Sequence, residues 1–297
     1  MVRPVVVGAG EVLWDVFPDS EHFGGAPTNV ALHAAALGAE AWLVSAVGRD
    51  ARGETALARL ERGGVQRAAV AVLTDHPTGI VHVSLDSTGQ PGYAIASGSA
   101  WDHIPWSAII AQVAERADAI CFGSLAQRAP LSRATIRRAV AATRRSAWRL
   151  FDVNLRQPYD DAGVVTASLE LANAVKLNDE ELPVVAGMCG LGTAPQADQL
   201  KALCDRFELR LAALTRGAGG AMLVTPDDFS EVAAPRTTVA DTVGAGDAFT
   251  ATLLVGMLAG RALNEVNERA NAVAAYVCSQ PGATPPIPAE LGWTATL

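Results

Sequence analysis

The stretch DTVGAGDAF, residues 241–249, leads without a helix breaker into the apolar segment 250–255. Its small residues predict a tight turn that opens a helix, with the first backbone N–H groups of the helix left free and converging on one point. These groups lie at the positive end of the helix and would bind an anion such as a phosphate. Asp247 would be repelled by that anion unless it takes a proton from the group that attacks it. A plain turn would explain the glycines but not the acids, so the stretch predicts phosphoryl transfer to a hydroxyl.

The whole chain has 297 residues, of which 50% are hydrophobic and 18% charged. This size allows one large α/β domain with a substantial core. The net charge of -8 argues against nucleic acid or an anionic membrane as partner, and no apolar run reaches membrane-spanning length. The N-terminus carries no signal-peptide pattern, so we expect a cytoplasmic protein. Reduced thiols without metal-ligand spacing are expected at Cys121, Cys189, Cys204 and Cys278.

Strand and helix patterns alternate along most of the chain. The buried strands are predicted at 5–7, 41–47, 119–122, 149–153, 174–177 and 211–214. Such alternation predicts parallel βαβ units in one doubly wound, mostly parallel sheet flanked by helices. Two segments, roughly 12–24 and 69–100, alternate apolar and polar residues instead and predict a small sheet with one solvent face. Without a linker or an internal repeat, residues 1–297 are expected to form a single α/β domain that carries this sheet as an insertion.

Polar or glycine-rich segments follow several of these strands. Within residues 152–156, DVNLR, Arg156 would neutralise a phosphate or clamp a substrate oxygen. The oxygen atoms of residues 178–181, NDEE, suit Mg²⁺, although an acidic helix start would explain them as well. Residues 215–220, TRGAGG, would let the backbone approach a nucleotide, or would form a hairpin turn. Because the carboxyl ends of parallel strands share one edge of a sheet, we expect these segments to gather there.

The first long helix opens at residues 24–29, GGAPTN. Its paired glycines allow a close backbone approach, and Asn29 would cap the helix or bind a hydroxyl. Asp15, a few residues after the first strand, is either a loop acid or a ligand contact. Other phosphate-binding signatures are absent from the sequence, namely the GxxxxGK[ST] P-loop and the protein-kinase HRD and DFG. The GAG at residues 8–10 has neither a third glycine nor a helix after it, which argues against a dinucleotide fold.

These motifs together resemble those of the ribokinase/PfkB superfamily of carbohydrate kinases, and of its fructokinase branch in particular. The resemblance covers nearly the whole chain, and the last of its motifs is highly specific. In the family's order the motifs are GE at 10–11 with Asp15, FGGAPTNVA at 23–31, VGRD at 47–50, FDVNLR at 151–156, Asn178 with Glu181, TxGxxG at 215–220 and DTxGAGDxF at 241–249. The resemblance implies a ribokinase-like fold in which the small sheet is a lid that closes over the sugar and excludes water.

The resemblance also implies an ATP-dependent kinase acting on a sugar hydroxyl, with Asp247 as the general base. The implied anion hole is made by the backbone amides of Gly244, Ala245, Gly246 and Asp247. The residues implied to hold the sugar are Asp15, Gly25, Asn29, Arg156 and Asp247. Those implied to hold the nucleotide are Asn178, Thr215, Gly217, Gly220, Gly246 and Asn271.

Two metal ions are implied as well. Glu181 would act on Mg²⁺ through water. A K⁺ ion near the anion hole would take Asp241, the carbonyl of Val243 and the Gly282 region, although the prolines at 285–286 stand where some relatives offer a hydroxyl.

Two departures from the family patterns bear on the substrate. Ala26 stands where ribokinases carry a lysine, which argues against ribose, and residues 93–102, which we expect in the lid and sugar pocket, are less typical of fructokinases. Val153 stands where fructokinases usually have proline, a change that we do not expect to affect the chemistry. Fructose is therefore the expected acceptor, with other ketoses, 2-keto-3-deoxygluconate and nucleosides as alternatives within the same chemistry. A non-catalytic sugar-binding regulator is the alternative of a different class. The expected partners are a small-molecule sugar and a nucleotide, and the lid admits a homodimer.

Overall fold

The structure, a computed structural model, describes residues 3–85 and 91–293. Within these residues, nine strands form one large sheet in the order β13-β12-β11-β10-β9-β8-β1-β4-β5. The strands are β1 (Val5–Ala9), β4 (Glu40–Gly48), β5 (Val70–Leu73), β8 (Ala119–Gly123), β9 (Trp148–Asp152), β10 (Ala174–Asn178), β11 (Leu211–Thr215), β12 (Ala221–Val224) and β13 (Phe229–Val232). All neighbours from β11 to β5 pair in parallel, and β12 and β13 add an antiparallel edge.

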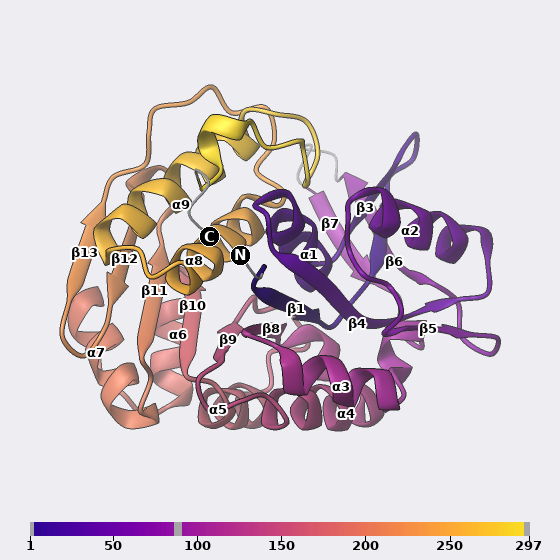
Figure 1. The fold of residues 1–297 in the computed structure, drawn as a ribbon, viewed down its shortest axis with the longest axis horizontal. Coiled ribbons are helices and arrows are strands. Elements are labelled where there is room, and N and C mark those ends of the chain that lie inside the picture. Colours follow the sequence, from indigo (N-terminus) through magenta and orange to yellow (C-terminus); the bar gives the residue numbers. More distant parts are fainter. Residues whose placement is uncertain (1–2, 86–90, 294–297) are drawn as a thin grey trace.

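Helices cover both faces of this sheet (Figure 1). One face carries α1 (Ala26–Ala36), α2 (Ala51–Arg62), α8 (Ala245–Leu258) and α9 (Leu263–Cys278). The other carries α3 (Ala108–Arg116), α4 (Pro130–Ala141), α5 (Ala162–Leu171), α6 (Glu181–Met188) and α7 (Gln196–Phe207). Alternate residues of β1 enter different cores, since Val5 and Val7 pack in one apolar cluster and Val6 in the other. The predicted doubly wound α/β class is confirmed.

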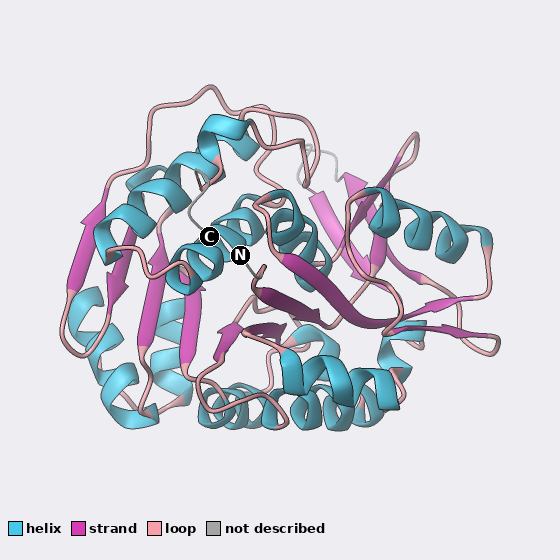
Figure 2. Cartoon of the chain, viewed as in Figure 1, coloured by secondary structure: helices cyan, strands magenta, loops and turns pink. Residues whose placement is uncertain are grey.

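A second, four-stranded sheet stands beside the large one (Figure 2). Its order is β3-β2-β6-β7, with β2 (Leu13–Val16), β3 (Glu21–Gly24), β6 (Gly79–Leu85) and β7 (Pro91–Ile95). Strands β2 and β6 pair in parallel, and the other pairs are antiparallel. No helix in the described part of the chain is both long and apolar enough to cross a membrane.

The expectation that the whole segment 69–100 joins the small sheet needs a correction at its start. Val70–Leu73 forms β5, which pairs in parallel with the end of β4 in the large sheet. Pairing there buries Val70 and covers the outer edge of β4, which would otherwise expose unpaired backbone groups. The small sheet therefore takes only β6 and β7 from this segment.

Candidate active site

Helix α8 begins in the predicted anion-binding stretch. Its N-cap residue, Gly244, has φ +80°, and a Cβ atom there would lie 2.2 Å from the carbonyl oxygen of Ala283. Both observations require glycine at this position. The helix then buries every residue from Ala248 to Gly256, so its first turn is held firmly at the edge of the large sheet. The first N–H groups of α8 have no acceptor inside the helix. That of Ala245 donates over a long 3.4 Å to the carbonyl oxygen of Thr242, and an anion can compete for it.

Asp247 lies in that first turn and contacts helix α1. The side-chain amide of Asn29 donates a hydrogen bond of 2.8 Å to Oδ2 of Asp247. Burial and the nearby carboxylate of Asp152 raise the pKa of Asp247 from 3.8 to about 6, while Asn29, Lys176 and Arg156 lower it in part. A carboxylate with a pKa this close to neutrality is suited to take up a proton and release it again.

Asp15 and Asn29 approach each other across a glycine. A Cβ atom on Gly24 would lie 3.6 Å from Oδ2 of Asp15 and 3.9 Å from Nδ2 of Asn29. Gly25, with φ +111°, is the N-cap of α1, and a Cβ there would lie 2.4 Å from the carbonyl oxygen of Glu11. Strand β2, which carries Asp15, and the start of α1 thus bring Asp15, Gly25 and Asn29 to the same corner as Asp247. Sequence reasoning named all four residues.

Arg156 supplies positive charge to this corner. Its side chain is exposed and donates to the carbonyl oxygen of Leu155 at 2.8 Å. Its charge lowers the pKa values of Glu11, Asp15 and Asp247, each of which burial raises. Arg156 therefore lies near enough to all three carboxyl groups to favour their charged forms.

A buried ion pair that sequence reasoning missed lies beneath the anion-binding turn. Lys176 of β10 donates to Oδ1 of Asp152 at 3.1 Å, and the hydroxyl of Thr250 donates to Oδ2 of the same carboxylate at 2.9 Å. A Cβ on Gly246 would lie only 3.1 Å from Nζ of Lys176, so the ammonium group contacts the turn directly. Burial opposes its charge, but the carboxylates of Asp152, Glu181 and Asp247 outweigh that effect and raise the pKa of Lys176.

The sequence does carry a signal for this pair. Lys176 interrupts an otherwise apolar strand whose neighbours in the sheet are themselves buried. A lysine at such a position needs a buried partner of opposite charge. The acid at the end of the adjacent strand, Asp152, is the partner that the parallel register offers, because it pairs with Lys176 across β9 and β10.

Glu181 links, through hydrogen bonds, the end of β10 at Asn178 to the segment that follows β9. Glu181 accepts hydrogen bonds from the backbone N–H groups of Leu155 at 2.8 Å and Asn178 at 2.9 Å, one on each carboxylate oxygen. Oδ1 of Asn178 accepts from the N–H groups of Glu180 and Glu181 and so fixes the start of α6. Each oxygen of Glu181 keeps a further lone pair for a water molecule, which fits the indirect contact to Mg²⁺ expected of it.

A cavity of about 570 Å³ lies on the other side of the anion-binding turn. It brings together five of the six predicted nucleotide residues, Thr215, Gly217, Gly220, Gly246 and Asn271, with Ala245 of the turn. The remaining predicted residue, Asn178, is not in its lining, which otherwise includes Ala218, Pro235, Thr237, Val239, Phe249, Ala274, Ala275 and Cys278. Apolar walls with a few polar groups suit a flat heterocyclic base. Asn271 is held there by hydrogen bonds of 2.9 Å from its amide to the backbone and side-chain oxygens of Asn267.

The predicted cation residues also meet. One oxygen of Asp241 accepts from the N–H of Val243 at 3.0 Å, and the other accepts from the N–H of Gly282 at 3.2 Å. The carboxylate thus joins the turn before α8 to the segment after α9. In this arrangement it is the N–H groups of the two residues, and not their carbonyls, that point at Asp241.

Glu11 is a second functional group that sequence reasoning did not single out. It is 3% exposed, its Oε1 accepts from the N–H of Ala26 at 3.2 Å, and its Oε2 is buried without a partner. Burial raises its pKa to about 7, to which Asp247 also contributes. Glu11 belongs to the GE motif of the family resemblance. The structure adds that its carboxylate accepts a hydrogen bond from the first residue of α1.

At one edge, the doubly wound sheet thus brings together a helix start, a buried carboxylate of raised pKa and a largely apolar cavity, an arrangement that phosphoryl transfer can use. Residues 4–290 match the sequence family that is described as "pfkB family carbohydrate kinase". A putative sugar kinase of Pyrococcus horikoshii is 30% identical over 95% of this chain and 93% of its own length, and fructokinase of Salmonella typhimurium is 30% identical over 84% and 83%. The chain belongs to the pfkB family of carbohydrate kinases.

Solved structures agree with this assignment. The crystal structure of the Pyrococcus horikoshii sugar kinase in complex with ATP superimposes with a TM-score of 0.80 and 28% identity, covering 94% of this chain and 93% of that chain. Fructokinase from Vibrio cholerae in the apo form gives a TM-score of 0.78 with 26% identity, covering 94% and 99%. The expected ribokinase-like fold is thereby confirmed.

Proposed function

We propose that this protein transfers the terminal phosphoryl group of ATP to a hydroxyl group of fructose. The observation that carries the proposal is the position of Asp247. It lies between the free N–H groups of α8 and the polar corner formed by Asp15 and Asn29, and it contacts that corner through its hydrogen bond to Asn29. A sugar bound at Asp15 and Asn29 would present a hydroxyl to Asp247, with the phosphate on the far side of the turn.

In the proposed reaction, Asp247 takes the proton as the sugar oxygen forms its bond to the terminal phosphorus of ATP. The bond from that phosphorus to the bridging oxygen breaks, and ADP leaves. The backbone N–H groups of Gly244, Ala245, Gly246 and Asp247 would bind the charge that develops on the transferred group. Lys176 would add a positive charge directly beneath them.

ATP fits the cavity that Thr215, Gly217, Gly220 and Asn271 line, and relatives in this family have been solved with ATP bound. Asn178, outside that lining, would contribute from the phosphate side. Mg²⁺ would neutralise phosphate charge, and Glu181 is placed to hold its water shell. We also propose that a K⁺ ion would bind near the turn, held by Asp241, the carbonyl of Val243 and the Gly282 region.

Fructose as the acceptor is supported by the fructokinase relative and by the residues at the sugar corner. The small sheet would act as the lid, because its strand β2 carries Asp15 and its strand β3 ends at Gly24, directly before Gly25. We further propose that two copies pair through this sheet, whose strand β7 exposes Tyr93 at an edge. Light scattering on the purified protein tests the pairing.

A coupled assay of ADP release tests the reaction over fructose, other ketoses, 2-keto-3-deoxygluconate and nucleosides. Fructose is expected to give the highest kcat/KM, and Asp247→Asn to lower kcat by about 10²-fold to 10⁴-fold. The control is Asp227→Asn, which removes an exposed acid from the β12–β13 turn and should change nothing. Another best acceptor would overturn fructose but keep the chemistry. Tight sugar binding without ADP release from any acceptor would identify a non-catalytic regulator.

A further inference from the structure

His33 is a buried histidine that none of the family motifs includes. It lies on α1 one helical turn after Asn29, is 1% exposed, and its Nε2 is 3.0 Å from the carbonyl oxygen of Ala283. A carbonyl oxygen only accepts, so Nε2 carries the hydrogen and donates it. The bond joins two segments that are 250 residues apart in the chain.

Ala283 in turn contacts the turn that precedes α8. Its carbonyl oxygen, the one that accepts from His33, is also the atom nearest to Gly244, at 2.2 Å from the position that a Cβ would take. The backbone of Gly244 therefore rests directly on the group that His33 holds. Any shift of this carbonyl would change the space available to the first residue of the anion-binding turn.

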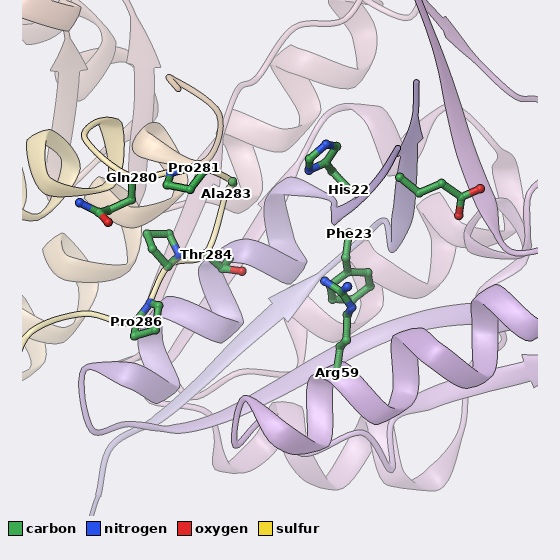
Figure 3. Close-up of a pocket in the computed structure, with 11 residues that line it drawn as sticks. His22, Phe23, Arg59, Gln280, Pro281, Ala283, Thr284 and Pro286 are labelled. Atoms are coloured by element: carbon green, nitrogen blue, oxygen red, sulfur yellow. The ribbon is translucent and has the colours of Figure 1, made fainter. Parts of the chain in front are cut away.

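The segment that contains Ala283 has open space on its other side. A cavity of about 440 Å³ separates Gln280–Pro286 from His22, Phe23 and Arg59 on the opposite wall (Figure 3). The segment is tied elsewhere by the N–H of Gly282, which donates to Asp241. Beyond it, the hydroxyl of Tyr276 donates to the carbonyl of Pro286 at 3.0 Å. Between these two ties, the described residues contribute a side-chain hydrogen bond to the segment from His33, at the carbonyl oxygen of Ala283.

We propose that His33 is a positioning residue for phosphoryl transfer, because it fixes the anion-binding turn through Ala283. Helix α1 then holds both ends of the turn, with Asn29 bonded to Asp247 and His33 bonded to the residue on which Gly244 rests. One rigid helix sets the distance between the base and the N–H groups. The role of the turn in this inference rests on the proposed function.

Two variants of similar size separate the hydrogen bond from packing. His33→Gln keeps an N–H donor, whereas His33→Leu fills the space without one. The control is Leu60→Ala, which removes buried volume from the apolar cluster that α1 also enters, but from helix α2, outside the predicted site. The readouts are amide hydrogen exchange of peptides covering 241–249 and 278–288, and kcat and KM for sugar and ATP.

For His33→Leu we expect faster exchange in both peptides and a fall in kcat of between about 10-fold and 100-fold, with the KM for sugar changed by less than about twofold. His33→Gln should recover most of the kcat and of the protection. Leu60→Ala should lower the melting temperature but leave kcat unchanged. Equal kcat values for the Leu and Gln variants, or unchanged exchange in 241–249, would overturn the proposal.

The exchange measurement does not depend on catalysis. If the wild-type protein phosphorylates no acceptor, the proposed function fails, yet the exchange of 241–249 in the Leu and Gln variants still shows whether His33 holds the turn. If wild type is active and the Leu variant keeps its kcat, the proposed function stands and the role of His33 is only structural.

Discussion

The side-chain amide of Asn29 donates directly to the carboxylate of Asp247, so two residues 218 positions apart share one hydrogen bond of 2.8 Å. This bond stabilises the charged form of Asp247 and lowers its pKa against the effect of burial. In Asn29→Ala the bond is lost and the pKa of Asp247 should rise. The acidic limb of the kcat/KM profile should therefore move to higher pH. An unmoved limb would show that Asp247 does not titrate in that profile.

The wild-type profile has its own expected form. The pKa of Asp247 is raised from 3.8 to about 6, and only its ionised form can take a proton. Activity should thus be constant near pH 8 and be roughly tenfold lower at pH 5. Steady-state rates with saturating ATP, with protein integrity checked at each pH, provide the measurement. A profile that is flat down to pH 5 would contradict the assigned base.

Lys176→Met should affect both stability and rate. Removal of the ammonium leaves Asp152 buried without its counter-charge, which costs about 3–5 kcal/mol in comparable buried pairs. The double variant Asp152→Asn with Lys176→Met removes both charges and should recover much of the stability, as measured by urea unfolding. Its kcat should stay low, because the positive charge beneath Gly246 is still missing. Recovery of kcat together with stability would restrict Lys176 to a structural role.

Glu11→Gln is expected to stabilise the protein at pH 8. The folded-state pKa of Glu11 is about 7 against 4.5 for the free group, so the folded state binds the proton more tightly than the unfolded chain. The stability that this proton supplies is complete below about pH 4.5 and is lost as the pH rises through about 7. Glutamine is neutral throughout and keeps an acceptor for the N–H of Ala26.

Thermal and urea unfolding at two pH values check this expectation. The gain in the free energy of unfolding should be on the order of 1–3 kcal/mol at pH 8 and small at pH 5. The control is Glu115→Gln, which changes an exposed acid on α3. A gain of equal size at both pH values would mean that the ionisation of Glu11 is not its cause.

Much of the fold and site could be predicted because the signals are local. The small residues and acids of 241–249 decide a turn and a helix start within nine positions, and the residues of 152–156 and 178–181 follow strand ends that a parallel sheet must align. Alternating strand and helix patterns then determine the class of the large sheet. For these parts, neighbouring residues in the chain contain the physical cause.

The parts that could not be predicted depend on contacts between distant segments. The pattern of Val70–Leu73 suits an edge strand of either sheet, and only the uncovered edge of β4 selects the large one. Lys176 and His33 each bond a group that lies far away in the sequence, at Asp152 and Ala283. A pattern of residue types shows that such a buried polar group needs a partner, but not where the partner lies.

The small sheet has a consequence for engineering. Its central pair joins strands from two separate excursions of the chain, which we call crossings. Strand β2 belongs to the crossing between β1 and α1, and β6 to the crossing between β5 and α3. The first crossing starts at the end of β1 and passes through residues 10–12, which include Glu11. It then forms β2 and β3 and enters α1 through Gly25. A chimera that grafts a relative's small sheet onto this chain must therefore exchange both crossings together and match the graft to Glu11 and Gly25. If only one crossing were exchanged, a strand of this chain would have to pair with a strand of the relative in place of the β2–β6 pair. The register that places Asp15 opposite Val81 would then be lost.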